Sequence, residues 1–225
     1  NTAGGSAKKL DYANMTEDDL LKKTIKDQKN ITLDEFIDLA STYSYATIND
    51  KLELDENIKV TKEVIKLAKK YGADVEAEIG CVGGSEDGSE DIAINCTKPE
   101  DAVKFEKETG VDALAIAIGN AHGNYKSTPK LRFDILEEVE KNTKLPLVLH
   151  GGTGITPDDF VRCAHTGIKK INIATATFDS VEHTVKSAYE KGEISGYYDL
   201  QGAEVEGAYQ NAKKHILIFG TDNKA

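Results

Sequence analysis

The amino-acid sequence predicts an α/β fold in which a parallel sheet, covered by helices, closes as a (β/α)8 barrel. From about residue 54 onward, helical and strand-like patterns alternate, with one pair every roughly 25 to 40 residues. No GxGxxG segment follows the first strand, which disfavours an open, doubly wound sheet. Polar, glycine-rich segments follow several different strands, as the shared C-terminal rim of a barrel requires.

The expected helices have recognisable boundaries. The first has an apolar stripe that Gly72 can end. The segment 97–100, Thr-Lys-Pro-Glu, resembles a capping box that opens the next helix, and Gly110 closes it. Pro157 follows a threonine at the start of another helix, which Gly167 stops. The expected helices span 55–71, 97–110, 131–140, 156–167, 177–189 and 201–218.

Short apolar runs mark the strands. The run ALAIAI at 113–118 has no polar alternation, so both of its faces are expected to be buried. The other strands are expected at 74–79, 145–149 and 171–174, with a fifth at 44–48. A barrel has eight strands, so about three are not recognisable, and residues 1–43 look mostly helical or polar. We therefore expect one barrel domain over residues 1–225 that is incomplete at its N-terminal side, with a divergent part at 1–50.

The composition of the chain indicates which kinds of binding partner and which cellular compartment to expect. The formal net charge of −11 disfavours nucleic acid and anionic membrane surfaces as partners. No apolar run has the roughly 20 residues of a membrane span, and no signal peptide is visible. The chain starts without Met, which is compatible with a start inside a longer reading frame. The three cysteines show no CxxC spacing, so we expect a reducing, cytoplasmic location rather than a disulfide framework.

Two of the five histidines lie just after predicted strands. His122 comes after the run 113–118 and His150 after the run 145–149, each beside glycine. Imidazoles at the C-terminal ends of neighbouring barrel strands can share one metal ion, and catalytic zinc typically takes three protein ligands. We expect a metal site here, the alternative being one core and one loop histidine. The remaining histidines lie in predicted helices and are expected at the surface: His165, His183 and His215.

Glycines and threonines surround these two histidines. Glycines allow backbone N–H groups to approach an anion closely, and threonine hydroxyls add donors. In barrels a phosphate often lies at the loops after late strands. The pattern therefore predicts a phosphate site, with simple turn chemistry as the alternative. Its residues are Gly123, Gly151, Gly152, Thr153, Gly154 and Thr175.

Two acids share one face of the strand at 74–79. Alternation places Glu76 and Glu78 opposite Ala77, and burial of both is costly unless they face water, a partner or a metal. A salt bridge to Lys is the alternative. The acidic, glycine-rich segment after this strand suits a mobile lid on which Glu86 could reach a substrate proton, the alternative being a disordered acidic loop.

Five segments together resemble the class II, zinc-dependent fructose-bisphosphate and tagatose-bisphosphate aldolases. They are VEAEIG, GGSEDG, GVDALAIAIGNAHGNYK, PLVLHGGTGI and KINIAT, and the resemblance covers residues 52–220. It implies a TIM barrel of the class II aldolase type, with 51–220 as the matched portion. It also implies a glycolytic lyase that cleaves a ketose 1,6-bisphosphate to dihydroxyacetone phosphate and glyceraldehyde 3-phosphate, and a homo-oligomer, either dimer or tetramer.

The resemblance also implies roles for individual residues. His122 and His150 would bind Zn²⁺, alone or with a second divalent or a monovalent cation, and Glu78 would approach the metal. Glu86 would move a proton next to the ketone, and Asn172 would lie near the enediolate. Lys126 would add charge near the phosphate or a cation. The residues implied in binding dihydroxyacetone phosphate are Gly123, Gly151, Gly152, Thr153, Asn172 and Thr175.

One family segment is not found in the sequence. Class II aldolases carry Leu-Asp-His-Gly after an early strand, which supplies a further zinc ligand and an acid for the C4 hydroxyl proton. Here the nearest match is Leu33-Asp34-Glu35, with Glu in place of His. We therefore expect weak zinc binding and poor turnover, or a non-catalytic phosphate-binding relative. A metal-dependent hydrolase of a sugar phosphate is a third reading, and the choice between fructose and tagatose stays open.

A Schiff-base mechanism is disfavoured by the position of the lysines. Such a mechanism needs a Lys at the carboxyl end of a strand, where it can attack a ketone. Lys169 and Lys170 precede the strand expected at 171–174. The metal-dependent route is therefore the expected one.

Overall fold

A computed structural model describes residues 53–84, 95–125 and 129–222, all within a compact unit that spans Ala46–Ala225. The strand expected at 44–48 lies outside the described residues. The helices and strands follow one another in the order α3 (Leu54–Ala68), η2 (Lys69–Tyr71), β1 (Glu76–Ile79), α4 (Pro99–Thr109), β2 (Ala113–Ile116), α5 (Phe133–Asn142), β3 (Leu147–Leu149), α6 (Pro157–His165), β4 (Ile168–Ile171), α7 (Thr175–Glu190) and α8 (Tyr197–Phe219).

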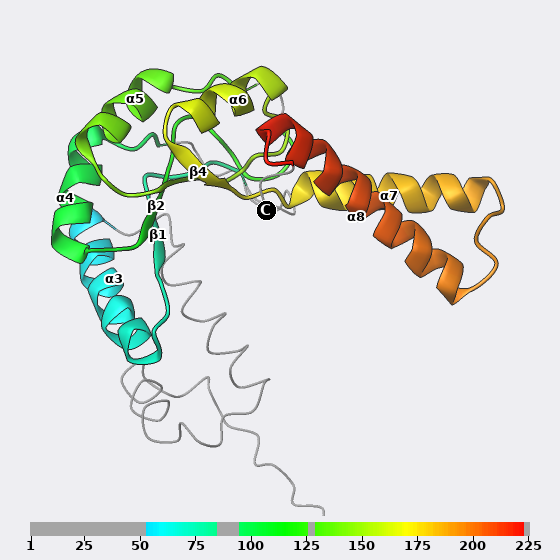
Figure 1. Ribbon diagram of the computed structural model, residues 1–225, viewed down its shortest axis with the longest axis horizontal. Helices are drawn as coiled ribbons and strands as arrows, with labels where there is room; N and C mark the ends of the chain where they lie inside the picture. The colour runs from blue at the N-terminus through cyan, green and yellow to red at the C-terminus, as the bar shows by residue number, and fades with distance from the viewer. Residues whose placement is uncertain (1–52, 85–94, 126–128, 223–225) are drawn as a thin grey trace, which may run out of the picture. The chain divides into compact units, whose positions relative to one another are not determined.

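The four described strands form one parallel sheet in the order β1-β2-β3-β4. Each strand therefore pairs with the next one along the chain, which is the arrangement of successive strands in a (β/α) barrel. Helices α3, α4, α5 and α6 lie along the outer face of these strands (Figure 1). The prediction of a parallel sheet with helical cover is confirmed.

The core lies between the strands and these outer helices. Phe105 of α4, Leu136 of α5 and Phe160 of α6 are almost completely buried against β2 and β3, whose Leu114 and Leu149 have no exposed surface. Burying side chains of this size stabilises the fold by about 1.5–3 kcal/mol each. This packing fixes the strands, and with them the loops that follow their carboxyl ends.

The capping role predicted for Thr97 is wrong. Its hydroxyl does not cap α4, whose N-cap residue is Lys98 and has no side-chain cap. Instead, the buried Thr97 hydroxyl donates to the Ile79 carbonyl over 2.7 Å and accepts from the Ala117 N–H over 2.9 Å. It therefore joins the chain after β1 to the chain after β2. By contrast, α6 begins where Thr156 and Pro157 predicted a helix start, and the Thr156 hydroxyl caps it by accepting from the Asp159 N–H.

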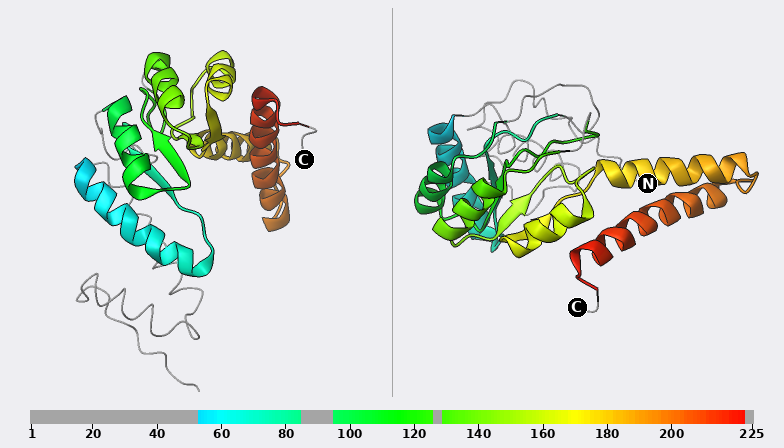
Figure 2. Two further views of the ribbon diagram at one scale, coloured as in Figure 1. Left: turned by 60° about the vertical axis from the view of Figure 1, so that its left-hand side comes forward. Right: turned by 90° about the horizontal axis from the view of Figure 1, so that it is seen from above.

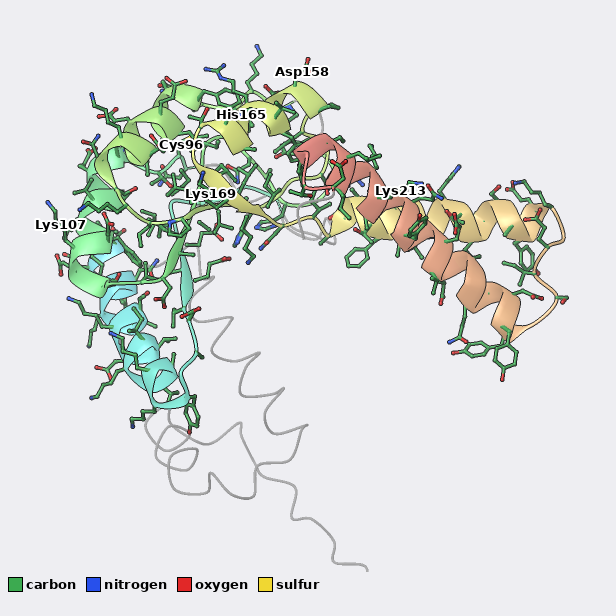
Figure 3. All side chains as sticks on the ribbon, in the orientation of Figure 1. Cys96, Lys107, Asp158, His165, Lys169 and Lys213 are labelled. Carbon is green, nitrogen blue, oxygen red and sulfur yellow. The ribbon has the colours of Figure 1, made fainter. Side chains whose placement is uncertain are left out.

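The fourth strand begins earlier than predicted. It spans Ile168–Ile171, so Lys169 and Lys170 lie within the strand rather than before it. Val148 of β3 pairs with Lys170, which shows that this residue belongs to the sheet. Figure 3 shows Lys169 on β4 and His165 on the outer helix α6. The Lys170 side chain takes part in the site described below.

Helices α7 and α8 run side by side as an antiparallel pair (Figure 2). They cross closely at Gly207, where an added Cβ would lie 2.6 Å from the Val181 Cα. The C-terminal part of α8 packs on α6 through His215, whose ring lies 5.9 Å from that of Phe160. The expectation that His215 lies at the surface is therefore wrong, because only 8% of it is exposed. Among the described residues, no helix combines the length and apolar character needed to cross a bilayer.

Candidate metal centre and anion pocket

Three side chains with metal-binding atoms meet at the carboxyl edge of the sheet. Glu78 lies in β1, His122 in the loop after β2 and His150 directly after β3. One ligand atom from each of them lies within 4.8 Å of one from each of the others. The two imidazole rings have centroids 6.2 Å apart and are tilted by 53°. Neighbouring strand ends thus bring together the residues that the sequence singled out.

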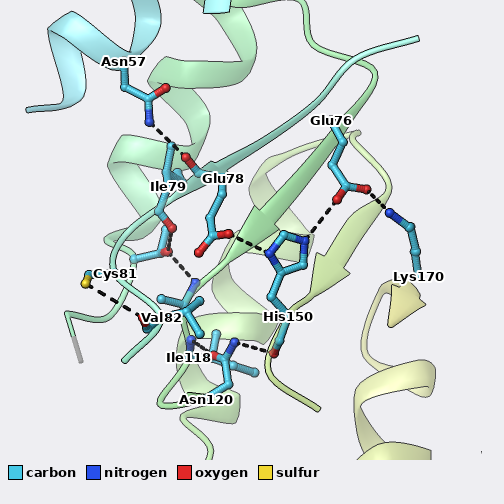
Figure 4. A network of polar contacts seen from close by, with 12 residues as sticks. Asn57, Glu76, Glu78, Ile79, Cys81, Val82, Ile118, Asn120, His150 and Lys170 are labelled. Carbon is cyan, nitrogen blue, oxygen red and sulfur yellow. Dashed lines mark hydrogen bonds and ion pairs between the residues drawn. The ribbon is translucent and has the colours of Figure 1, made fainter. Parts of the chain in front are cut away.

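His150 is held by two carboxylates (Figure 4). Its Nδ1 lies 2.6 Å from Glu78 Oε2, and its Nε2 lies 3.0 Å from Glu76 Oε1. Burial lowers the pKa of His150, but the hydrogen bonds to Glu76 and Glu78 outweigh this effect and raise the pKa to about 9. The ring is therefore protonated near neutral pH and donates from both nitrogens.

Lys170 forms an ion pair with Glu76, the second of these two carboxylates. Its ammonium group lies 2.8 Å from Glu76 Oε2. The hydrogen bond from His150 is the main cause of the lowered pKa of Glu76, and Lys170 adds to it against the effect of burial. Glu76 and Glu78 thus share one face of β1 as predicted, and the alternative of a salt bridge to Lys also holds for Glu76. The sequence did not predict the part played by Lys170.

The donor set fits a divalent metal ion. Two imidazoles and one carboxylate form a common ligand set of catalytic zinc, in which ligand–metal distances are about 2.0–2.2 Å. Glu78 Oε1 is buried and makes no hydrogen bond among the described residues, so it is available as a ligand atom. Binding would require His150 to lose a proton and to release one of its carboxylates.

A pocket of about 180 Å³ adjoins the cluster and shares both histidines with it. This is room for several water molecules, and so for a phosphate group. Among the residues that the sequence analysis named as phosphate-binding, the pocket is lined by Gly123, Gly151, Gly152, Thr153, Asn172 and Thr175. Gly154 does not line it, and Glu86 and Lys126 lie outside the described residues. The structure therefore brings most of the predicted residues to one place.

Helix α7 begins at this pocket, which its sequence did not predict. Thr175 is the first residue of α7, whereas the helix was expected from 177. Its N-cap residue is Ala174, which has no polar side chain, so no capping signal marked the start. Free backbone N–H groups and the helix dipole favour an anion at such an end. In this turn the Ala176 N–H already donates to the Thr153 hydroxyl over 3.0 Å, and the Thr177 N–H donates to the Ala174 carbonyl over 2.8 Å, so these two amides are not free for an anion.

Backbone contacts further define the pocket wall. The Gly152 N–H donates to the Asn172 carbonyl over 3.3 Å, so this amide is already engaged. A Cβ at Gly152 would lie 3.1 Å from that oxygen. Gly152 therefore serves the pocket by its lack of a side chain, while the amides on either side of it remain the better candidates for an anion.

Comparison with known proteins identifies relatives of this arrangement. The model of the family "Fructose-bisphosphate aldolase class-II" matches residues 38–224. A fructose-bisphosphate aldolase of Staphylococcus aureus is 38% identical over 172 residues, which cover 76% of this chain and 60% of that protein. The crystal structure of the YdjI aldolase from Escherichia coli superposes with a TM-score of 0.67 and 33% identity, covering 79% of this chain and 61% of that one.

A fructose-bisphosphate aldolase structure from Campylobacter jejuni superposes with a TM-score of 0.59 at 24% identity, covering 76% of this chain and 57% of that chain, and supports the fold alone. The chain thus spans about three fifths of the length of these relatives. The matches confirm the predicted fold class, in which the described strands form part of a class II aldolase barrel.

Proposed function

Since the chain belongs to the class II fructose-bisphosphate aldolase family, we propose that it is a Zn²⁺-dependent lyase that reversibly cleaves a ketose 1,6-bisphosphate. The substrate would be the fructose or tagatose compound, and the products dihydroxyacetone phosphate and glyceraldehyde 3-phosphate. One observation supports this most directly. The cluster of Glu78, His122 and His150 shares its two histidines with a pocket that has room for a phosphate.

The proposed reaction assigns separate tasks to the cluster and the pocket. His122, His150 and Glu78 would hold the metal ion. When bound, this ion would act as a Lewis acid that stabilises negative charge on the ketone fragment as the carbon–carbon bond breaks. Asn172 lines the pocket and would orient that fragment through its side-chain amide. The resemblance to the family implies that Glu86 would transfer the proton next to the ketone, and Glu86 lies outside the described residues.

The pocket would hold the phosphate of the ketone fragment. Its wall combines the first turn of α7 with the Thr153 and Thr175 hydroxyls and the backbone near Gly123 and Gly151. These groups are neutral hydrogen-bond donors at one place. Such donors can bind an anion even though the chain as a whole has a net charge of −11. Lys126 would add positive charge and also lies outside the described residues. We further propose a cytoplasmic homo-oligomer that acts on sugar phosphates, without nucleic-acid or membrane partners.

An aldolase assay with controlled zinc content tests this proposal. The purified chain should cleave a ketose bisphosphate, lose this activity in EDTA and regain it with Zn²⁺. His122→Ala should lower zinc affinity and activity by at least about 100-fold, because one of three ligands is lost. His183→Ala, which changes an exposed histidine of α7, is the matched control and should change neither. Cleavage that persists in EDTA would contradict a metal-dependent mechanism.

A second function is favoured by the composition of the cluster. Within the described residues it contains two imidazoles, and the further imidazole of the family segment is replaced by Glu35 in the nearest sequence match. The chain could then bind phosphates without efficient cleavage. In that case the wild-type protein would bind inorganic phosphate and only weakly bind zinc, with no measurable turnover. Full zinc occupancy with rapid cleavage would exclude this second function.

A further inference from the structure

We propose that Asn120 and Tyr125 act as positioning residues that lock the loop after β2 to the loop after β3. This lock would hold the metal cluster and the anion pocket in one arrangement, because each loop contributes one histidine to both. The inference rests on the proposed function for the identity of the ligands that these loops bind, a divalent metal ion and a phosphate. The lock itself follows from contacts among described residues.

Tyr125 joins the two loops through its hydroxyl and its ring. The hydroxyl accepts from the Ala121 N–H over 2.7 Å and donates to the Gly151 carbonyl over 3.0 Å. The ring packs on Gly154, where an added Cβ would lie 3.0 Å from Tyr125 Cδ2. Burial raises the pKa of Tyr125, so the phenol keeps the proton that it donates. One side chain therefore contacts both ends of the segment 151–154.

Asn120 makes a second connection between the loops. It has no exposed surface, and its Oδ1 accepts from the Ile118 N–H over 2.7 Å. Its Nδ2 donates to the His150 carbonyl over 2.9 Å, as Figure 4 shows. Together with Tyr125, it thus binds two consecutive carbonyl groups of the β3 loop. A buried side-chain amide with partners at both ends is well suited to fix geometry.

Fixing these carbonyls also fixes the amides of Gly151 and Gly152, two residues that line the pocket. Each peptide unit is planar, so the His150 carbonyl sets the direction of the Gly151 N–H, and the Gly151 carbonyl sets that of the Gly152 N–H. The latter donates to the Asn172 carbonyl. Side chains from the adjacent loop therefore fix the backbone that carries His150 and the neighbouring amides, while Glu76 and Glu78 hold the ring itself.

Backbone contacts show how closely the loops fit. A Cβ at Gly151 would lie 2.2 Å from the Ala121 carbonyl oxygen. On the other side, the His122 N–H donates to the Gly83 carbonyl over 2.6 Å, and a Cβ at Gly84 would lie 2.5 Å from the His122 oxygen. The loop that carries His122 is thus held between two glycine-containing loops. Loss of one of the contacts that hold this loop should therefore change the geometry of both the metal cluster and the pocket.

Tyr125→Phe tests the lock, since it removes the hydroxyl and keeps the ring. The affinity of the metal-free protein for Zn²⁺ and the affinity for inorganic phosphate should both fall, by about five- to tenfold each. Amide hydrogen exchange within 150–153 should accelerate by a similar factor. Tyr189→Phe, on an exposed tyrosine of α7, is the matched control and should change none of these. Thr175→Val should weaken phosphate binding alone, which shows that the two affinities can be separated.

The outcomes distinguish the lock from the proposed function. If the wild type binds both ligands and Tyr125→Phe changes neither affinity, the lock is refuted while the proposed function stands. If the wild type binds neither ligand, the proposed function fails, and exchange within 150–153 decides on the lock. Unchanged exchange there would then refute it. Equal losses of affinity in Tyr125→Phe and Tyr189→Phe would likewise show a nonspecific effect and overturn the inference.

Discussion

Glu76→Gln is expected to flatten the pH dependence of stability in the metal-free protein. In the wild type, the protonated His150 ring lies between Glu78, 2.6 Å from Nδ1, and Glu76, 3.0 Å from Nε2. Burial disfavours the charged ring, but these two hydrogen bonds prevail and raise the pKa of His150 from 6.5 to about 9. Folding therefore takes up a proton in this interval.

The sign and size of the effect follow from linkage. A pKa that is higher in the folded state adds stability that is fully present below pH 6.5 and is lost as the pH rises through about 9. For His150 this contribution is roughly 3 kcal/mol. The pKa of Glu76 is lowered, mainly by His150, so its contribution is present above the ordinary value of 4.5 and lost below it. Stability from this network should therefore be greatest between these two regions.

Removing one of the two carboxylates should remove about half of the His150 contribution. Urea unfolding in a chelator should show Glu76→Gln to be less stable than the wild type by roughly 1–2 kcal/mol at pH 6. The difference should shrink towards pH 10, leaving only the part due to Lys170. Glu182→Gln, which breaks an exposed pair with Lys186, is the control and should give a difference that does not vary over this range. A constant difference for Glu76→Gln would refute this account of His150.

Two further substitutions test the packing around the site. Gly151→Ala should displace the loop after β3, because the φ of Gly151 is +61° and the added Cβ would meet the Ala121 oxygen. The free energy of unfolding should fall by roughly 2–4 kcal/mol, and the affinity for phosphate should fall as well. Gly192→Ala, with φ +70° in open space, should cost only about 1 kcal/mol, and equal costs would contradict the proposed contact. Phe160→Ala should cost about 3–5 kcal/mol in a thermal or urea unfolding measurement, since Phe160 packs on the rings of α8. The exposed Phe178→Ala is its control, and similar losses for both would show that α8 is not held by this ring.

The sequence predicted those elements whose own residue pattern matches their burial in the fold. Apolar runs predicted the first three strands, and the expectation that residues after neighbouring strands meet placed His122 near His150. It failed at the fourth strand because Ile171 and Ile173 suggested an apolar core that begins after the lysines, whereas sheet pairing begins at Ile168. Pairing depends on the partner strand, and a single strand's composition does not reveal it.

Other errors have a similar origin. Thr97 and His215 are polar residues whose partners lie far along the chain or in another helix, so their own neighbours gave no sign of burial. The buried face of α8 contains Gly207, Asn211 and His215, which no search for an apolar stripe would select. Asn120 and Tyr125 were missed because their role depends on how two loops meet.

The topology explains why the cluster depends on the middle loop. Adjacent parallel strands lie about 4.8 Å apart, so the ends of β1 and β3 are separated by about 10 Å with β2 between them. Glu78 and His150 span this gap with their side chains, and the loop after β2 brings a ligand atom of His122 within 4.8 Å of both. A shift of that loop therefore changes the distances from His122 to both of the other ligand residues. Helices α7 and α8 contribute to this region mainly through the first turn of α7, so their outer parts should tolerate substitution without loss of metal affinity.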